Sequence, residues 1–472
     1  MYIFFITNLI IGCFLAINRS KIIKNILLGI FILVNALFTL YSIKNIGLKG
    51  TFFNSDPLSV IFTTILFIIS TISIFHSYPY LKWQQKKERE HNFYFAAMVI
   101  LVTALNAAYS ANHIAITWVF VEITTISASF LIYYRRTELT LEATWKYIFV
   151  CSISVTFIFI GILFLSISMK NSAVSEMTYD ILMEKAQTFD PFWLKMAFIF
   201  IFTGFTAKAG LFPMYTAGID AKDKAPSPAG AIFASGVMNV GLCGIIRTYA
   251  IIHRTEILSW SKTVLTISAL ISIFIASVYI MKVLNFKRML AYSSVEHMGI
   301  ITLGLAMGGP GIFAALFHSI NHSLIKPALF YQSGIFYRVF GSKFINETGG
   351  FIKYSISGSL VFLFGYLLVI AVPPSGLFIS EFIIFKEMFI QGKFLLMTAV
   401  MILITVIIWA LGRNILKATF IPISGDDRSL EKPSFIESFP QLCLILCVVL
   451  MGTYPPQSIL KLLEEVVSMV IG

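Results

Sequence analysis

Charge is scarce in this chain of 472 residues. Only 12% of the residues are charged, whereas 58% are hydrophobic and the mean hydropathy is +0.86. A soluble globular domain carries roughly a quarter charged residues, so the composition excludes a soluble enzyme. The net charge of +12 comes from 35 Lys and Arg against 23 Asp and Glu without any long basic run, which excludes a disordered or nucleic-acid-binding protein.

Cysteine is also scarce, and its spacing excludes a metal or redox motif. The chain has five cysteines, each in or beside an apolar stretch, namely Cys13, Cys151, Cys243, Cys443 and Cys447. We expect them to fill the core. The first 17 residues are apolar but lack a basic leader and a small-residue cleavage site. We interpret them as a first membrane span rather than a signal peptide.

Long hydrophobic runs, by contrast, occupy almost the whole chain. A spanning helix needs about 20 mostly apolar residues. Fourteen windows of this kind begin near Tyr2, Ile22, Pro57, Asn92, His113, Tyr147, Phe192, Pro226, Leu258, Arg288, Gly311, Ser355, Leu395 and Phe435. We therefore predict an all-α integral membrane protein with about 14 transmembrane helices. Residues 456–470 predict an interfacial helix.

Lys and Arg are distributed unevenly over the loops. Counted over alternating loops, 22 lie on one side, Arg19 and Arg428 among them, and about ten lie on the other. Basic residues gather at the cytoplasmic ends of membrane spans. We therefore predict that the amino terminus lies outside and that the seven basic loops lie in the cytoplasm.

Two features recur at matching places in the two halves of the chain. Gly and Pro interrupt the seventh window at residues 210–213 and the twelfth at residues 373–378. A Val-Glu pair occurs at Glu122 in the fifth window and at Glu296 in the tenth. Both pairs lie five windows apart, and an odd number reverses the orientation in the membrane. This pattern predicts two inverted five-helix repeats that contain broken helices, as in many transporters.

Several ionisable residues lie inside the predicted spans. A charged residue at the centre of a span costs roughly 2.5 to 3.5 kcal/mol, so such residues usually face an interior cavity and mark an ion or proton path. The candidate residues are Glu122, Lys208, Glu296, His297, His318, His322, Lys326, Glu381 and Lys386, with the polar Asn239. Asn239 does not titrate and only orients water or a neighbouring group.

His318, His322 and Lys326 form a row along the eleventh window. Their spacing of four residues places them on one face of a helix. Histidine titrates near neutral pH, so the row is suited to passing protons. Two other interpretations stay open. The histidines are also suited to hydrogen bonds between helices, or to zinc, although no further zinc ligands are evident.

Glu122 and Lys208 form a candidate ion pair. A pair that opens and closes changes the affinity of both groups for protons, because burial and loss of the partner act on each. A purely structural salt bridge is the alternative. Near the break, Asp220, Lys222, Asp223 and Lys224 are interpreted as a solvated turn in preference to a proton funnel.

Four segments carry a family resemblance: FTAKAGLFP at 205–213, APSPAG at 225–230, KRMLAYSSVEHMG at 287–299 and FHSINHSLIKPALF at 317–330. They resemble the antiporter-like proton-translocating subunits of respiratory complex I and of Mrp-type cation/proton antiporters. Within that superfamily the last two are most similar to component F of hydrogenase-4 and its relatives in membrane-bound hydrogenases and formate hydrogenlyases.

The resemblance implies a division of the chain and roles for individual residues. It implies N-terminal helices at 1–91, repeats at 92–253 and 254–420, and a C-terminal helix with a tail at 421–472. Glu122 resembles the family glutamate and Lys208 its paired lysine, while His322 and Glu381 match relay positions. Asn239 replaces the central lysine of many complex I members, and Glu296 is an additional charge.

The function that we predict is proton translocation by a membrane subunit of an energy-converting hydrogenase or complex I-like oxidoreductase. A subunit of a Na⁺/proton antiporter and a structural scaffold that moves no ions are the alternatives. We expect a multi-pass protein of a prokaryotic plasma membrane with membrane and peripheral partner subunits. The chain has no Fe–S, nickel, flavin or nucleotide motif. No catalytic centre or bound cofactor of its own is therefore expected, and Fe–S clusters and a NiFe centre are expected in partner subunits.

Overall fold

The computed structural model describes residues 1–472 except 19, 49, 171–175 and 423–431, so Arg19 and Arg428 lie outside the described residues. The described chain folds into helices and has no strand, only three isolated bridges. The longer helices are α1 (Tyr2–Ile17), α2 (Lys21–Lys44), α3 (Pro57–Trp83), α4 (Glu88–Ser110), α5 (Ile114–Ile132), α6 (Glu138–Ser168), α8 (Pro191–Ala209), α11 (Met238–His253), α12 (Leu258–Lys282), α13 (Phe286–Met307), α14 (Pro310–Phe340), α15 (Ile356–Val369), α16 (Gly376–Ile390), α17 (Phe394–Phe420), α18 (Phe435–Thr453) and α19 (Gln457–Ile471).

Ten of the described helical segments are long and apolar enough to cross a membrane. Most helices begin where the hydrophobic windows predict, and side chains cap several of them. Asp56 accepts a hydrogen bond from the backbone N–H of Ser59 at the start of α3. The main boundary difference is in α6, which begins at Glu138 rather than near Tyr147. Thr137 and Thr140 form a capping box there that extends the helix over polar residues.

Two helices are interrupted at the predicted places. α8 ends at Ala209, and Gly210 adopts a φ of +76°, a left-handed conformation that favours glycine. The short helix α9 (Thr216–Lys224) follows the break. In the second half of the chain, α15 ends at Val369 and α16 begins at Gly376. Because of these two breaks, the end of α8 and the start of α16 lie next to buried side chains.

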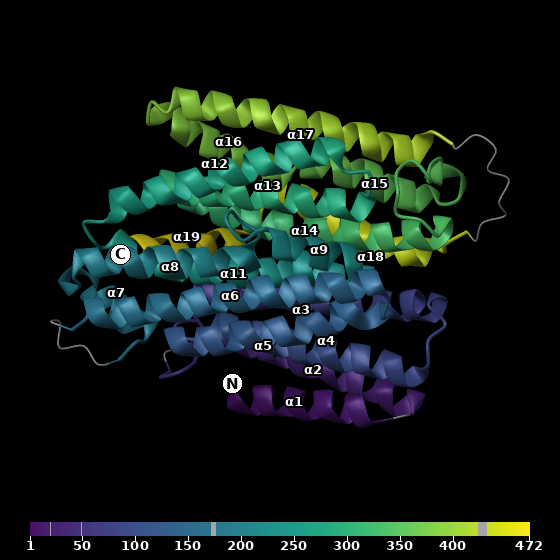
Figure 1. The fold of residues 1–472 in the computed structure, drawn as a ribbon, viewed down its shortest axis with the longest axis horizontal. Helices are drawn as coiled ribbons and strands as arrows, with labels where there is room; N and C mark the ends of the chain where they lie inside the picture. The colour runs from purple at the N-terminus through teal and green to yellow at the C-terminus, as the bar shows by residue number, and fades with distance from the viewer. Residues whose placement is uncertain (19, 49, 171–175, 423–431) are drawn as a thin grey trace.

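The helices lie side by side along the long axis of the molecule, with α1 and α2 at one edge and α17 at the opposite edge (Figure 1). α14 is the most central helix, and nearly all of its residues are buried. α19 packs against α11, α3 and α14. Arg254 donates hydrogen bonds to the carbonyl oxygens of Met469 and Val470 near the end of α19.

A π-helical turn at Phe233–Val237 lies between α10 (Ser227–Ile232) and α11. Such turns occur frequently at functional sites. Directly after it, α11 approaches the end of α8 closely, since a Cβ on Gly241 would lie 2.2 Å from the backbone nitrogen of Ala209. The backbone of α11 at Gly241 therefore packs directly against the backbone of α8 at Lys208 and Ala209.

Only two of the cysteines are buried. Cys151 and Cys243 lie in the core, whereas Cys13, Cys443 and Cys447 are exposed, and all five are free thiols. The expectation that the cysteines fill the core is therefore wrong for three of them. These three lie on helices whose outer faces are apolar, so an apolar sequence context alone did not indicate burial.

Candidate functional site

Lys208 is buried near the end of α8, with 3% of its surface exposed. Its ammonium group donates hydrogen bonds to Thr125 Oγ1 on α5 at 2.8 Å and to Tyr147 OH on α6 at 3.2 Å. It also lies 5.2 Å from the centroid of the Tyr147 ring. The buried ammonium group of Lys208 thus has uncharged hydrogen-bond partners on two helices.

Glu122 is half-buried on α5, one helical turn before Thr125. It interacts electrostatically with Lys208. However, no ion pair is formed between these two described residues, and the buried Oε2 of Glu122 has no hydrogen-bond partner. The predicted pair is therefore close but open in this structure.

Asn239 lies on α11, directly after the π-turn, and is buried. Its Nδ2 donates a hydrogen bond to Ser323 Oγ on α14 at 2.8 Å, and the Ser323 hydroxyl lies 3.2 Å from Asn239 Oδ1. The side chain thus joins α11 to the central helix. Because an amide does not titrate, Asn239 orients its surroundings without itself carrying a proton.

The row on α14 faces α13, and one α13 histidine, His297, contacts both histidines of the row. His297 Nδ1 lies 3.0 Å from His318 Nε2. The His297 and His322 rings lie 5.4 Å apart, and neither ring nitrogen of His322 has a hydrogen-bond partner. The spacing predicted one shared face on α14, and the structure places the three imidazoles together.

Lys326, the third member of the row, is fully buried. Its Nζ donates a hydrogen bond to Ser293 Oγ on α13 at 2.6 Å. It also interacts electrostatically with Glu296. Glu296 Oε2 lies 3.6 Å from Nε2 of the adjacent His297. α13 and α14 therefore enclose a cluster of carboxylate, imidazole and ammonium groups.

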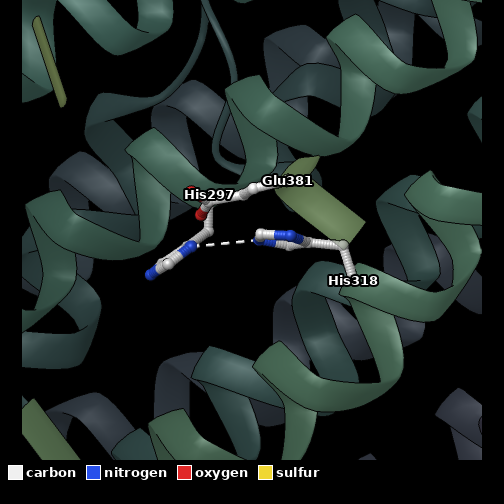
Figure 2. Close-up of side chains that lie close together, drawn as sticks. All are labelled: His297, His318 and Glu381. Carbon is white, nitrogen blue, oxygen red and sulfur yellow. Dashed lines mark hydrogen bonds between the residues drawn. The ribbon is translucent and has the colours of Figure 1, made fainter. Parts of the chain in front are cut away.

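Glu381 extends the cluster to α16. Figure 2 shows the rings of His297 and His318 joined by their hydrogen bond, with the Glu381 side chain reaching over from α16. The neighbouring Ser380 Oγ lies 2.9 Å from His318 Nδ1. The break before α16 thus places a hydroxyl and a carboxyl group beside the histidines.

The same three side chains have the composition of a metal site. His297, His318 and Glu381 each bring a ligand atom within 4.8 Å of the others, and two imidazoles with a carboxylate suit zinc. In this arrangement, however, both ring nitrogens of His318 are taken by His297 and Ser380. The geometry therefore favours a hydrogen-bonded chain over metal coordination.

Lys222 on α9 was missed, because the sequence predicted a solvated turn there. It is 2% exposed, and its Nζ donates a hydrogen bond to the thioether sulfur of Met238, a weak acceptor, at 2.9 Å. Asp223 is also buried; Asn285 donates to its Oδ1 at 3.0 Å, and Lys343 donates to its carbonyl oxygen at 2.7 Å. The expectation of a solvated turn is therefore wrong.

Lys222 connects the two parts of the site. Its positive charge disfavours positive charges on His322 and Lys326. Its partner Met238 touches the break in α8, since a Cβ on Gly210 would lie 3.0 Å from the Met238 methyl group. The sequence does contain an indication that Lys222 is buried. α9 follows directly after the break at Gly210, whereas the prediction placed only the residues before the break inside the membrane.

Lys386 does not belong to the cluster. It is exposed on α16, whereas Glu381 is buried on the same helix. The two residues are five positions apart, and residues at that spacing do not share a helix face. The interpretation of Lys386 as part of a buried path is therefore corrected.

Comparisons with known proteins agree with this geometry. The transmembrane family described as NADH:quinone oxidoreductase/Mrp antiporter matches residues 111–407, more than half of the chain. The chain is 28% identical over 445 residues to a hydrogenase-4 component F homolog of Methylacidiphilum infernorum, covering 93% of this chain and 92% of that protein.

Two solved structures share the fold. One is a chain of the membrane-bound sulfane sulfur reductase, an archaeal respiratory membrane complex, with a TM-score of 0.87, 21% identity and coverage of 100% and 97% of the two chains. The other belongs to the Mrp complex of a Dietzia species, with a TM-score of 0.83, 16% identity and coverage of 99% and 98%. The resemblance seen in the sequence motifs is thus confirmed, and the chain belongs to the NADH:quinone oxidoreductase/Mrp antiporter transmembrane family.

Proposed function

We propose that this chain is a proton-translocating membrane subunit of an energy-converting hydrogenase or a related complex I-like oxidoreductase. Redox chemistry in partner subunits drives protons through the buried residues of this chain. The observation that carries the proposal is the series of buried ionisable groups from Lys208 through Lys222 to the cluster on α13, α14 and α16. The relative named as a hydrogenase-4 component F homolog supports the hydrogenase type.

The first step is a switch at Glu122 and Lys208. In the open arrangement, Lys208 rests on Thr125 and Tyr147, which carry no charge. A buried ammonium without a counter-ion releases its proton more readily than a paired one. Closing the pair with Glu122 favours uptake of a proton at Lys208, and opening it favours release.

The second step passes the proton from α8 toward α14. Asn239 does not titrate, so the proton is taken up by the amine of Lys222 through intervening water. Lys222 then gives the proton to His322 and returns to the amine. The burial of Lys222 and its contact with Met238 at the break in α8 support this route.

The third step uses a directional chain of hydrogen bonds. Ser380 donates its hydroxyl proton to the carbonyl oxygen of Leu377 at 2.8 Å. Its oxygen then accepts from His318 Nδ1, so His318 Nε2 accepts from His297 Nδ1. This assignment leaves His297 Nε2, which has no hydrogen-bond partner, free to accept a proton. Protonated His322 gives its proton to His297 Nε2, and the proton on His297 Nδ1 then moves to His318 Nε2. His318, now doubly protonated, releases a proton to the carboxylate of Glu381, whose oxygen lies within 4.8 Å of both histidines. Glu381 is the exit.

The architecture we propose has fourteen membrane passes. This number results if α8 and α9 form one broken span, α15 and α16 form another, and α10 continues through the π-turn into α11. The short helix at residues 179–185 and α19 are not counted as passes. We propose inverted repeats at 92–253 and 254–420, flanked by N-terminal helices at 1–91 and a C-terminal part at 421–472. The breaks after Ala209 and before Gly376 support the repeat.

The setting we propose is the plasma membrane of a prokaryote, with the amino terminus outside. The asymmetric distribution of Lys and Arg supports this orientation. The solved structures that share the fold belong to multisubunit membrane complexes, which supports membrane partner subunits. Fe–S clusters and a NiFe centre are assigned to peripheral partners, and this chain binds no cofactor of its own.

A second candidate is a subunit of an Mrp-type Na⁺/proton antiporter, which the structural similarity to a chain of the Mrp complex favours. The two candidates differ in what drives the protons. Inverted membrane vesicles that contain the assembled complex are energised by dihydrogen or by formate, and separately by an imposed Na⁺ gradient. Proton uptake is followed with a pH-sensitive dye.

The hydrogenase-type proposal predicts uptake with dihydrogen or formate and none with the Na⁺ gradient. Uptake with the Na⁺ gradient alone would identify the antiporter. If neither treatment moves protons while the complex is assembled, the chain is a structural scaffold and the proposed function is wrong.

A further inference from the structure

We propose that an anionic phospholipid binds this chain at the edge of the bundle formed by α1, α4 and the end of α5. One acyl chain lies in an apolar groove between these helices, and the phosphate group binds to basic residues at the start of α4. Figure 1 shows α1, α4 and α5 close together at the edge of the molecule that also carries the N-terminus. This site lies apart from the buried proton path.

The groove provides the apolar half of the site. It has a volume of about 550 Å³ and is lined chiefly by Ala16, Phe93, Ala97, Ile100, Phe130 and Tyr133. Small residues on α1 and α4 leave the space, and the exposed rings of Phe93 and Phe130 form its walls. An apolar groove of this size at the edge of a membrane-spanning bundle suits an acyl chain.

A second hollow of about 750 Å³ provides the polar half. It is lined by Gln85, Lys86, Lys87, Arg89, Glu90, Phe93 and Arg136. Glu90, Phe93 and Arg136 also line the apolar groove, so the two spaces adjoin. The polar hollow therefore lies at one end of the apolar groove, as a headgroup lies at the end of its chains.

The charges in the polar hollow are not balanced by the protein. Arg136 pairs with Glu90 at 3.2 Å, and Lys86 donates a hydrogen bond to the carbonyl oxygen of Tyr134 at 2.7 Å. In the part of the chain that the structure describes, no acidic side chain pairs with Lys87 or Arg89, and both are exposed. Two cations thus remain available for a phosphate group.

The combination of the two halves identifies the ligand class. A free phosphate would use the cations and leave the groove unused, while a helix of a partner subunit would fill the groove and leave the cations unpaired. Basic pockets between transmembrane helices bind anionic headgroups on the cytoplasmic side. Under the proposed orientation, the start of α4 lies on that side.

The test uses the purified, delipidated complex in detergent, with thermal stability as the readout. Dioleoyl phosphatidylglycerol, dioleoyl phosphatidylcholine and glycerol 1-phosphate are titrated separately. We expect phosphatidylglycerol to stabilise the complex, with little effect of the zwitterionic lipid or of the chain-free phosphate. In K87Q/R89Q, phosphatidylglycerol binding is expected to weaken by about 25-fold, because each basic residue near the headgroups contributes about fivefold.

Two further variants keep the test decisive. Ala97→Phe fills the groove without changing any charge and is expected to abolish stabilisation by phosphatidylglycerol. The matched control K282Q/K353Q removes two exposed lysines elsewhere and is expected to bind like the wild type. Equal stabilisation by both lipids, equal loss in the control, or unchanged binding in K87Q/R89Q would overturn the proposal. So would a crosslink from Phe93 to a partner helix that persists when phosphatidylglycerol is added.

Discussion

Lys208 on α8 and Lys326 on α14 are both buried lysines, but their surroundings differ. Lys208 donates to Thr125 and Tyr147, and Glu122 is the ionisable residue that approaches it from α5. Lys326 donates to Ser293 and belongs to a cluster with three histidines and two carboxyl groups. The first region depends on a single pair, whereas the second offers neighbouring groups that can replace one another. Substitutions in the first region are therefore expected to have the larger effects.

The largest effect is expected for Lys222, the residue that lies between the two regions. Lys222→Met keeps the length of the side chain but removes the amine. Because Asn239 does not titrate, we expect dihydrogen-driven proton uptake to fall about 100-fold, the scale of a positioned proton-transfer group. Lys222→His is expected to restore part of the uptake, whereas Lys222→Arg, which does not release its proton, is not.

A purely structural role for Lys222 gives the opposite order. Arginine would then replace lysine best, because it keeps the charge and most of the length. The control Lys282→Met removes an exposed lysine at the end of α12 and is expected to leave uptake unchanged. Normal uptake by Lys222→Arg in a fully assembled complex would show that Lys222 carries no proton.

Within the second region, one histidine is expected to compensate for another. His318→Gln removes the ring between His297 and Ser380, but His322 still lies beside His297. We therefore expect uptake to fall only about tenfold, less than the full contribution of a proton-transfer group. His318→Gln/His322→Gln is expected to fall much further. Equal loss in the single and double variants would contradict the idea of neighbouring groups that replace one another.

The smallest effect is expected for Lys386, which lies outside the second region. Lys386 is exposed on α16, away from Glu381. Lys386→Met is expected to change uptake by no more than about twofold, as for most surface substitutions. Dye-detected uptake at matched complex content checks this. A large loss of proton uptake in a fully assembled complex would show that Lys386 belongs to the proton path.

Much of the fold was predictable because hydrophobic windows and glycine or proline breaks act locally. The windows located most helix starts, and the breaks after Ala209 and before Gly376 were both expected. The helix period alone placed His318, His322 and Lys326 on one face. These features depend on residues close in the sequence.

Features that depend on packing between distant helices were not predictable. The contact of Asn239 with Ser323 joins α11 to α14 across 84 positions. The burial of Lys222 depends on α9 folding back into the bundle after the break. The position of Glu122 beside Lys208 was expected, but whether the pair is open or closed depends on Thr125 and Tyr147, which offer neutral partners.

The most direct test of the account measures protons moved per electron pair in the complex with Lys208→Met. Lys195→Met, on the same helix but only partly buried, is the control. Electron transfer by partner subunits is measured in the same vesicles. The account predicts that Lys208→Met lowers the proton-to-electron ratio sharply, while Lys195→Met leaves it unchanged. An unchanged ratio in a fully assembled Lys208→Met complex would contradict the claim that the buried residues of this chain carry protons.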